Sequence, residues 1–133
     1  MASVVADTHA VLWYIFSDPR LSERAARSMD AAGVNGDPIY VPSICLVEAT
    51  YLAEKGRIPW LALERLTAAL RNPLAGFRTA PLDLAVACQL RIIARDLVPD
   101  MPDRIIAATA LALRVPLVTR DENIRRSGLK TIW

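Results

Sequence analysis

Short apolar runs alternate with longer segments of helical periodicity along this chain of 133 residues. The runs are often β-branched, as buried strands are, whereas the segments between them repeat apolar residues every three to four positions. The predicted strands are residues 3–6, 39–41, 77–80 and 117–119, with an edge strand at 130–133. Strands that alternate with helices are typical of α/β proteins. We therefore expect a three-layer α/β/α fold around a central, mainly parallel sheet of four to five short strands.

The predicted helices begin and end at residues that favour helix boundaries. They span residues 10–15, 23–32, 43–56, 60–70, 83–95, 104–114 and 122–126. Serine, aspartate or proline stands just before several of these segments, and glycine follows others. In the segment 43–56, the apolar spacing predicts a buried stripe made of Ile44, Val47, Tyr51 and Leu52. Residues 98–102 are expected to form a loop.

The composition indicates one domain with much apolar surface to bury. The length is ordinary for a single domain, and no linker, repeat or low-complexity segment divides residues 1–133. The apolar fraction of 53% and the mean hydropathy of +0.27 are high for a soluble protein. Either the core is large or some apolar surface contacts a partner.

Targeting and cysteine patterns favour a cytoplasmic protein without membrane contact. No apolar run approaches the ~20 residues that span a bilayer, and the segment MASVVADTHAVLW lacks the Lys or Arg of a signal peptide. Cys45 and Cys88 lie far apart without CxxC spacing and are expected to be reduced core thiols. The net charge of +2 permits nucleic-acid binding without requiring it.

Three aspartates stand where predicted strands and helices meet. Asp7 follows the first strand, Asp121 follows the fourth, and Asp103 stands at the entrance to a helix. The carboxyl ends of parallel strands meet at one edge of a sheet, where such folds bind their ligands. We therefore expect these three carboxylates to project from the same edge.

Glu48 differs from the aspartates because it lies inside a predicted helix, among apolar neighbours at helical spacing. A buried carboxylate that stays ionised without a partner costs on the order of several kcal/mol, and a cation relieves this cost. Oxygen-only ligands suit hard ions such as Mg²⁺, and a bound ion can activate water and hold a phosphoryl oxygen. The four acids predict metal-assisted hydrolysis that needs neither histidine nor cysteine.

Each acid also has a structural explanation when it is taken alone. Asp7 and Asp121 are candidate N-caps, and Asp103 is a favourable charge at a helix N-terminus. Glu48 is a candidate partner for an arginine or for Lys55, although Lys55 is too far along the helix for a direct local pair. The joint pattern is more specific than any of its members.

Four segments of the chain resemble PIN-domain proteins, in particular the VapC-type toxins of bacterial toxin–antitoxin pairs and their DTHxxLW-like subgroup. In chain order these segments are VVADTHAVLW, SICLVEATYL, MPDRIIAATALAL and VPLVTRD. The residues that match the acidic quartet of the family are Asp7, Glu48, Asp103 and Asp121. The resemblance implies that these four residues are catalytic and bind the metal.

The resemblance further implies an activity and a set of partners. It implies a PIN-like endoribonuclease that uses Mg²⁺ or Mn²⁺ to hydrolyse RNA phosphodiester bonds and acts as the toxin of a toxin–antitoxin pair. It also implies a homodimer and inhibition by a small VapB-type antitoxin. Trp13, Tyr14 and Trp60 are candidates for the dimer or antitoxin contact, with simple core packing as the alternative.

Polar and basic residues near the acids complete the expected site. The supporting polar positions of the family map onto Thr8, Ser43 and Thr119, which are expected to orient the acids. The candidate RNA contacts are Arg104 and Arg120, with a basic patch extended by Arg125 and Arg126. A solvated charged face is the alternative for these arginines. His9 departs from the small polar residue that many family members have at its position.

Other function classes fit these residues less well. A haloacid-dehalogenase-like phosphatase needs a second aspartate two residues after the first, where this chain has His9. A receiver-like signalling domain needs an acid pair beside Asp7, and nucleotide binding through a phosphate loop needs a glycine-rich motif that does not occur. The remaining alternative is a PIN-like scaffold that binds RNA or protein without cleavage. Retention of all four acids argues against it.

Overall fold

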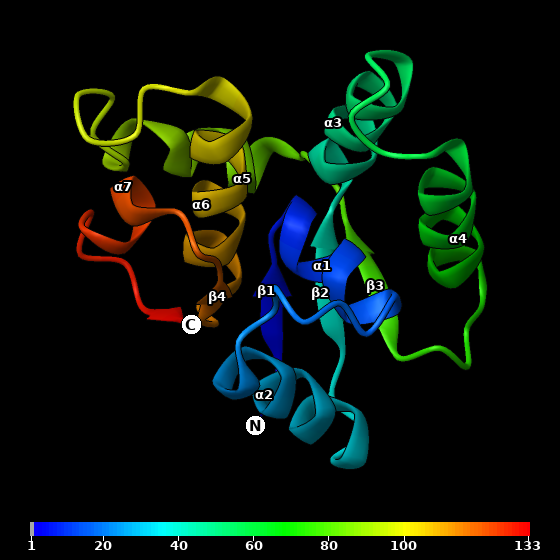
Figure 1. Ribbon diagram of the computed structural model, residues 1–133. Coiled ribbons are helices and arrows are strands. Elements are labelled where there is room, and N and C mark those ends of the chain that lie inside the picture. The colour runs from blue at the N-terminus through cyan, green and yellow to red at the C-terminus, as the bar shows by residue number, and fades with distance from the viewer. Residues whose placement is uncertain (1) are drawn as a thin grey trace.

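The computed structural model describes residues 2–133 and contains a five-stranded sheet in the order β3-β2-β1-β4-β5 (Figure 1). The strands are β1 (Val4–Ala6), β2 (Ile39–Pro42), β3 (Phe77–Ala80), β4 (Leu117–Val118) and β5 (Thr131–Ile132). Every pairing between neighbouring strands is parallel. The predicted α/β fold with a parallel central sheet is confirmed.

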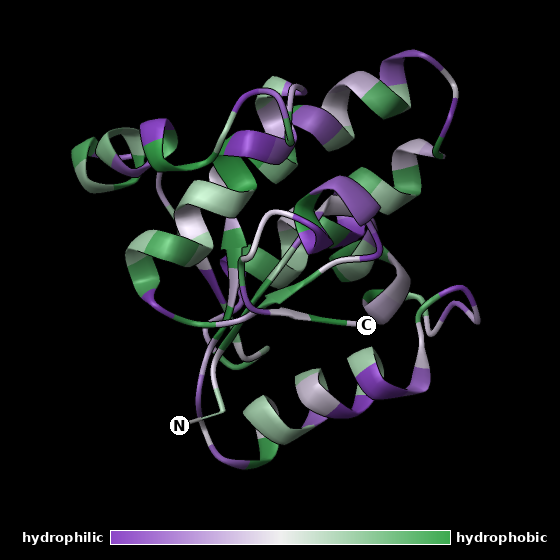
Figure 2. Ribbon diagram, turned by 90° about the vertical axis from the view of Figure 1, so that its left-hand side faces the viewer, coloured by the Kyte–Doolittle hydropathy of each residue, from purple (hydrophilic) through white to green (hydrophobic). Residues whose placement is uncertain are grey.

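Helices lie on both sides of the sheet, as expected for parallel strands (Figure 1, Figure 2). The helices are α1 (Thr8–Ile15), α2 (Glu23–Val34), α3 (Ser43–Glu54), α4 (Trp60–Arg71), α5 (Leu84–Gln89), α6 (Met101–Leu113) and α7 (Glu122–Arg125), with a short 3₁₀ helix η1 at Leu90–Ile92. Between residues 2 and 133, no helix combines the length and apolar character needed to cross a membrane.

The central strand β1 is buried on all sides. Val4, Val5 and Ala6 are at most 2% exposed, and helices α2 and α6 both contact the strand. Because β1 pairs with β2 on one side and β4 on the other, the turns that follow β1 and β4 emerge next to each other. This adjacency brings Asp7 and Asp121 to one edge of the sheet.

Helix α6 begins earlier than the sequence pattern predicted. It starts at Met101 rather than at residue 104, and its N-cap is Asp100, whose side chain accepts a hydrogen bond from the Asp103 amide at 3.1 Å. Pro102 lies inside the first turn, where its missing N–H has no partner to lose. Asp103 is therefore not before the helix but within its first turn.

The predicted helix 83–95 is wrong in its second half. Helix α5 ends at Gln89 and continues only as η1, after which the chain leaves helical geometry. The Arg104 side chain donates hydrogen bonds to the carbonyl oxygens of Ile93 at 2.8 Å and Leu90 at 3.1 Å. Arg104 thus links the end of η1 to α6, and Ile93, whose amide donates to the Leu90 carbonyl at 3.1 Å, is buried where the helix stops.

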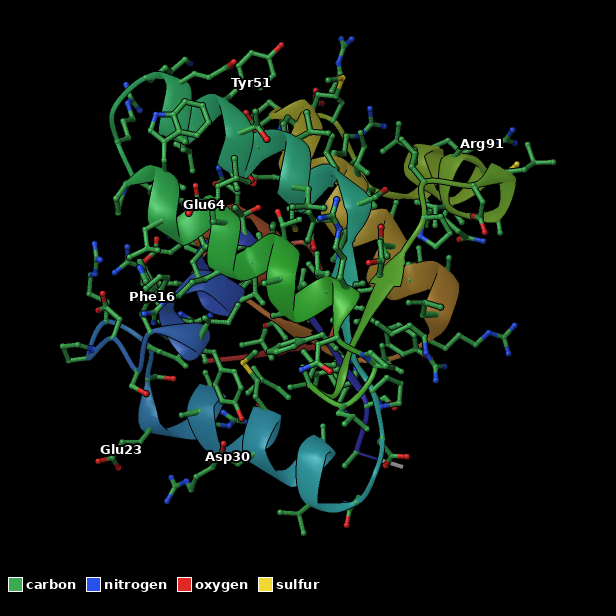
Figure 3. The ribbon with its side chains drawn as sticks, turned by 90° about the vertical axis from the view of Figure 1, so that its right-hand side faces the viewer. Phe16, Glu23, Asp30, Tyr51, Glu64 and Arg91 are labelled. Carbon is green, nitrogen blue, oxygen red and sulfur yellow. The ribbon has the colours of Figure 1, made fainter. Side chains whose placement is uncertain are left out.

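The predicted stripe on α3 is wrong at Val47 and Tyr51, while Ile44 and Leu52 are half-buried. Val47 and Tyr51 are 49% and 58% exposed, and Tyr51 points away from the protein (Figure 3). The buried row consists instead of Cys45, Ala49 and Ala53. Their small side chains allow close approach to α1, α4 and α6, which α3 contacts. Val47 and Tyr51 therefore face outward, whereas Ile44 is partly buried against the core.

Two further packing expectations need correction. Cys45 is buried as predicted, but Cys88 is exposed and is not a core thiol. Trp13 is buried and cannot present its ring to a partner, whereas Trp60 is 54% exposed. Tyr14 is half-buried, and its hydroxyl donates a hydrogen bond to Asp30 at 2.6 Å.

Candidate functional site

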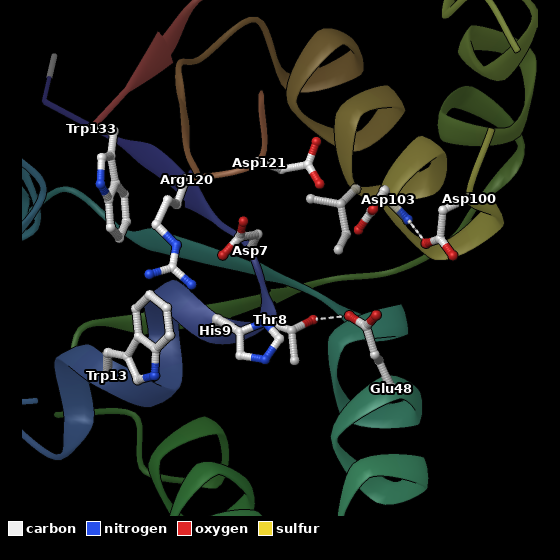
Figure 4. A pocket seen from close by; sticks show the side chains of 11 residues that line it. Asp7, Thr8, His9, Trp13, Glu48, Asp100, Asp103, Arg120, Asp121 and Trp133 are labelled. Carbon is white, nitrogen blue, oxygen red and sulfur yellow. Dashed lines mark hydrogen bonds between the residues drawn. The ribbon is translucent and has the colours of Figure 1, made fainter. Parts of the chain in front are cut away.

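A pocket of about 310 Å³ opens at the carboxyl edge of the sheet and contains all four predicted acids (Figure 4). Asp7 follows β1, Asp121 follows β4, Asp103 lies in the first turn of α6, and Glu48 lies on α3. We call this the acidic pocket. The topology thus brings together four carboxylates that are up to 114 positions apart in sequence (121 minus 7).

Asp7 caps helix α1 and also lines the acidic pocket. One carboxylate oxygen accepts a hydrogen bond from the Ala10 amide at 2.9 Å, so the capping explanation and the site explanation hold together. Burial raises the pKa of the Asp7 carboxyl, while hydrogen bonds from the Thr119 hydroxyl and the Ala10 amide oppose that rise. A nearby cation would stabilise the ionised form in this position.

Asp121 has the same double role at the start of α7. Its Oδ1 accepts a hydrogen bond from the Ile124 amide at 2.9 Å, and its own amide donates to the Thr119 hydroxyl oxygen at 3.1 Å. Because Thr119 also bonds to Asp7, one buried threonine connects the two capping aspartates.

Glu48 reaches the acidic pocket from α3 and is held there by Thr8. The Thr8 hydroxyl donates a hydrogen bond of 2.5 Å to Oε1 of Glu48 (Figure 4). Within residues 2–133, Glu48 forms no ion pair with Lys55 or with an arginine. The ion-pair alternative for Glu48 therefore does not hold, and the carboxylate faces the other acids.

The carboxyl of Asp103 is affected both by burial and by the charges of the other acids. Burial and then the charges of Asp100, Asp121, Glu48 and Asp7 raise the pKa of Asp103 to about 7. Carboxylate oxygens of Glu48, Asp100 and Asp103 all lie within 4.8 Å of one another. Such a group is costly when every member is ionised without a counter-charge.

Asp100 is the acid that the sequence interpretation missed. It caps α6 and lines the acidic pocket, three positions before Asp103. The signal was present as the spacing PDMPD, because residues three apart share a face at the start of a helix. The placement of residues 98–102 in a loop concealed it.

The donor set of the acidic pocket fits a hard divalent cation. Its acidic ligands are carboxylates, and no cysteine among the described residues 2–133 lines the pocket. Mg²⁺ and Mn²⁺ prefer oxygen ligands, and a bound cation would offset the repulsion that raises the pKa of Asp103. The residues present can therefore hold such an ion.

The three supporting polar residues are placed differently from one another. Thr8 and Thr119 are buried and bond directly to the acids. Ser43 does not line the acidic pocket, and its hydroxyl oxygen accepts a hydrogen bond from the Leu82 amide at 3.2 Å. In this structure Ser43 ties the start of α3 to the segment after β3.

The basic residues also separate into two groups. Arg120 lines the acidic pocket, with its guanidinium 4.7 Å from the ring centroid of Trp13. The Arg104 side chain is half-buried and bonds to backbone carbonyls. Arg126 pairs with Glu122 at 3.0 Å, in a separate depression shared with Arg125. Only Arg120 stands beside the four acids.

Aromatic rings line the side of the acidic pocket that carries Arg120 (Figure 4). The Trp13 ring lies between His9 and Trp133, at centroid distances of 5.4 and 6.0 Å. Trp133 was not identified from the sequence, because a single tryptophan at the last position has no pattern to mark it. The acidic pocket therefore has a carboxylate side and an aromatic, cationic side.

Comparison with known proteins identifies relatives over nearly the whole chain. The model of the family described as PIN domain matches residues 4–129. Ribonuclease VapC22 of Mycobacterium tuberculosis is 31% identical over 125 residues, which cover 94% of this chain and 92% of that protein.

Solved structures share the fold at lower sequence identity. VapBC2 from Rickettsia felis, bound to a DNA fragment from its promoter, has a TM-score of 0.72 at 18% identity and covers 97% of this chain and 96% of that one. FitAcB from Neisseria gonorrhoeae has a TM-score of 0.61 at 22% identity, covering 96% and 95%. A toxin–antitoxin complex from Klebsiella pneumoniae has a TM-score of 0.60 at 24% identity, covering 89% and 86%.

Proposed function

This chain belongs to the PIN domain family, and from that premise we propose that it is a divalent-metal-dependent endoribonuclease that acts as the toxin of a toxin–antitoxin pair. The observation that carries the proposal is the convergence of Asp7, Glu48, Asp103 and Asp121 on the acidic pocket. The relative named a ribonuclease supports the reaction class. We further propose that residues 1–133 act as a single domain.

The four acids would hold Mg²⁺ or Mn²⁺, and Asp100 stands beside them. The chemistry that such an ion supplies when bound is polarisation of a phosphodiester and activation of a water molecule. The chain itself contributes orientation: Thr8 fixes the carboxylate of Glu48, and Thr119 bonds to both Asp7 and Asp121. The Thr8 bond limits the rotation of the Glu48 carboxylate, whereas Thr119 holds the backbone of Asp121, whose carboxylate is held by the Ile124 amide.

Arg120 would contact a phosphate of the RNA beside the acids. Its guanidinium forms no ion pair among residues 2–133, and the Trp13 ring limits its movement. A positioned guanidinium binds phosphate through hydrogen bonds as well as charge. The positive charge of Arg120 also offsets part of the repulsion between the acids and a polyanionic substrate.

Exposed apolar residues on α3 and α4 form the surface where we propose that partners bind. Val47 and Tyr51 on α3 and Trp60 and Leu61 on α4 are exposed apolar residues, and α3 and α4 pack together. Such surfaces mark protein contacts. They support a homodimer and a VapB-type antitoxin partner, and solved toxin–antitoxin complexes of the same fold support the latter. A cytoplasmic location is consistent with this assignment.

The proposal is tested by RNA cleavage with Mg²⁺ or Mn²⁺, comparing the parent with Asp7→Asn. Asparagine is also a good N-cap, so the variant should keep α1 while it loses the charge at the metal site. We expect metal-dependent products from the parent and a large loss of rate in the variant. Unchanged cleavage by Asp7→Asn would reject the proposed site, and RNA binding without products would favour the scaffold alternative.

A further inference from the structure

A second pocket of about 330 Å³ adjoins the acidic pocket. It lies between the end of α1 and the start of α4, and we call it the side pocket. The two pockets share His9 and Trp13 as lining residues. An RNA chain that enters the acidic pocket can therefore continue past His9 into the side pocket.

The charges of the two pockets differ in sign. The acidic pocket carries five carboxylates and one arginine, whereas the side pocket carries Arg20 and Arg57 with one carboxylate, Asp18. Arg20 pairs with Asp18 at 2.7 Å. In the described chain, the Arg57 side chain has no ion pair or hydrogen bond, so its charge is available to a ligand.

Trp13 connects the cations of the two pockets. Its ring lies 4.7 Å from the Arg120 guanidinium in the acidic pocket and 5.0 Å from the Arg20 guanidinium in the side pocket. One buried ring thus lies against a guanidinium group of each pocket. Because Arg20 is paired with Asp18, the arginines of the two pockets without an ion pair among residues 2–133 are Arg120 and Arg57, which can meet successive negative charges of one ligand.

The side pocket also offers exposed aromatic surface. His9 is exposed where the pockets meet, and Phe16 is 37% exposed at the end of α1. The Arg65 guanidinium lies 5.1 Å from the Phe16 ring centroid and adds positive charge to this rim. Proteins recognise single-stranded RNA by stacking bases on aromatic rings beside a cationic track.

We propose that the side pocket is a subsite for a nucleotide of single-stranded RNA that lies next to the two nucleotides whose bond is cleaved in the acidic pocket. The base stacks on the exposed Phe16 ring, Arg57 contacts the adjacent phosphate, and His9 lies where the RNA passes between the two pockets. This inference rests on the proposed ribonuclease function and deepens it by naming the residues that select a single-stranded substrate. A bound peptide is the competing occupant, but RNA is favoured because the two pockets adjoin and Arg57, which has no ion pair within residues 2–133, can contact a backbone phosphate.

The test measures cleavage of single-stranded oligoribonucleotides of increasing length in Mg²⁺ by Phe16→Ala and Arg57→Gln. On long RNA we expect KM to rise about tenfold for Phe16→Ala, as for loss of one stacked base, with kcat nearly unchanged. Arg57→Gln should also raise KM. The slope of log KM against log salt concentration should fall by about one, because one fewer counterion is released when RNA binds. A dinucleotide, too short to fill both pockets, should be cleaved equally by all variants.

Arg91→Gln is the matched control, because Arg91 is an exposed arginine that Figure 3 places far from Phe16. It should behave as the parent, and Phe16→Tyr should restore the parental KM. Parental KM values for both side-pocket variants on long RNA would overturn the proposal. An equal loss of kcat/KM on long RNA and on the dinucleotide would also overturn it. A variant that loses only affinity for an antitoxin peptide would instead assign the side pocket to protein binding.

Failure of the proposed function gives a different result. If the parent produces no metal-dependent products, the side pocket is tested by binding of a fluorescent single-stranded RNA with Ca²⁺ in place of Mg²⁺. Weaker binding by Phe16→Ala and Arg57→Gln, but not by Arg91→Gln, would support the subsite. Equal binding by all four proteins would overturn it.

Discussion

The Thr8 hydroxyl donates a hydrogen bond to the Glu48 carboxylate across 40 positions of sequence. Thr8 is buried at the first position of α1, so the helices α1 and α3 meet at this bond. The bond limits the rotation of the one acid that comes from the middle of a helix. Glu48 therefore depends on Thr8 for its place in the acidic pocket.

Thr8→Val should weaken metal binding without unfolding the protein. Valine keeps the shape of threonine but removes the donor, and loss of a residue that orients a metal ligand typically costs about 10–100-fold in affinity. Isothermal titration with Mn²⁺ measures this change. Thr8→Ser, which keeps a hydroxyl, should retain most of the affinity. Equal Mn²⁺ affinity for Thr8→Val and the parent would contradict the role of the bond.

Without metal, the stability of the protein should fall as the pH rises from about 4 to 7. The folded state raises the pKa of Asp103 from 3.8 to about 7, so it holds this proton more tightly than the unfolded chain does. Ionisation across this interval therefore favours unfolding, and buried Asp7, whose pKa is also raised, acts in the same direction. Melting curves in EDTA across this pH range measure the fall.

Asp103→Asn should remove much of this pH dependence. Above pH 7 we expect the free energy of unfolding of the variant to exceed that of the parent by on the order of 1 kcal/mol, after allowance for solvent screening. Below about pH 4 the two proteins should be equally stable. Asp96→Asn, an exposed aspartate outside the acidic pocket, is the control and should follow the parent. If the stability of Asp103→Asn changed with pH as that of the parent does, the described repulsion between Asp103 and the other acids would be contradicted.

Mg²⁺ or Mn²⁺ should raise the melting temperature of the parent. An ion that binds only the folded state at 100 times its Kd adds about 2.7 kcal/mol to the free energy of unfolding. Asp103→Asn should show a smaller rise than the parent at every metal concentration. A constant melting temperature for the parent over a wide range of Mn²⁺ would argue against a preformed metal site.

Arg104 should matter for stability rather than for RNA binding. Replacing it with methionine removes hydrogen bonds to two carbonyl oxygens, each worth about 1–2 kcal/mol for a charged donor. Thermal unfolding should show the loss, while the KM for RNA of the folded protein stays near that of the parent. An increased KM with unchanged stability would restore Arg104 as an RNA contact.

Much of the fold was predictable from the sequence because local signals agree with the final structure. The strands at Val4–Ala6 and Phe77–Ala80 are short runs that the pattern identified directly. The family resemblance also holds, since the family model covers residues 4–129. Positions of the aspartates after β1 and β4 follow from the strand order of a parallel sheet.

The errors arose where tertiary packing overrides a local pattern. On α3, Cys45 and Ala49 face the core while Tyr51 does not, because small residues permit close helix packing. Pro102 indicated a loop but lies in the first turn of α6, which concealed Asp100. Trp133 joins the site only through the position of β5 beside β4, a long-range relationship that sequence spacing does not carry.

Metal-dependent RNA cleavage by the parent, Asp103→Asn and Asp96→Asn in the same assay tests the role of the acidic pocket most directly. We expect products from the parent and Asp96→Asn only when Mg²⁺ or Mn²⁺ is present, and a loss of cleavage rate of about a hundredfold or more for folded Asp103→Asn. Cleavage by the parent in EDTA, or a parental rate for Asp103→Asn, would contradict the assignment of the acidic pocket as a metal-dependent ribonuclease site.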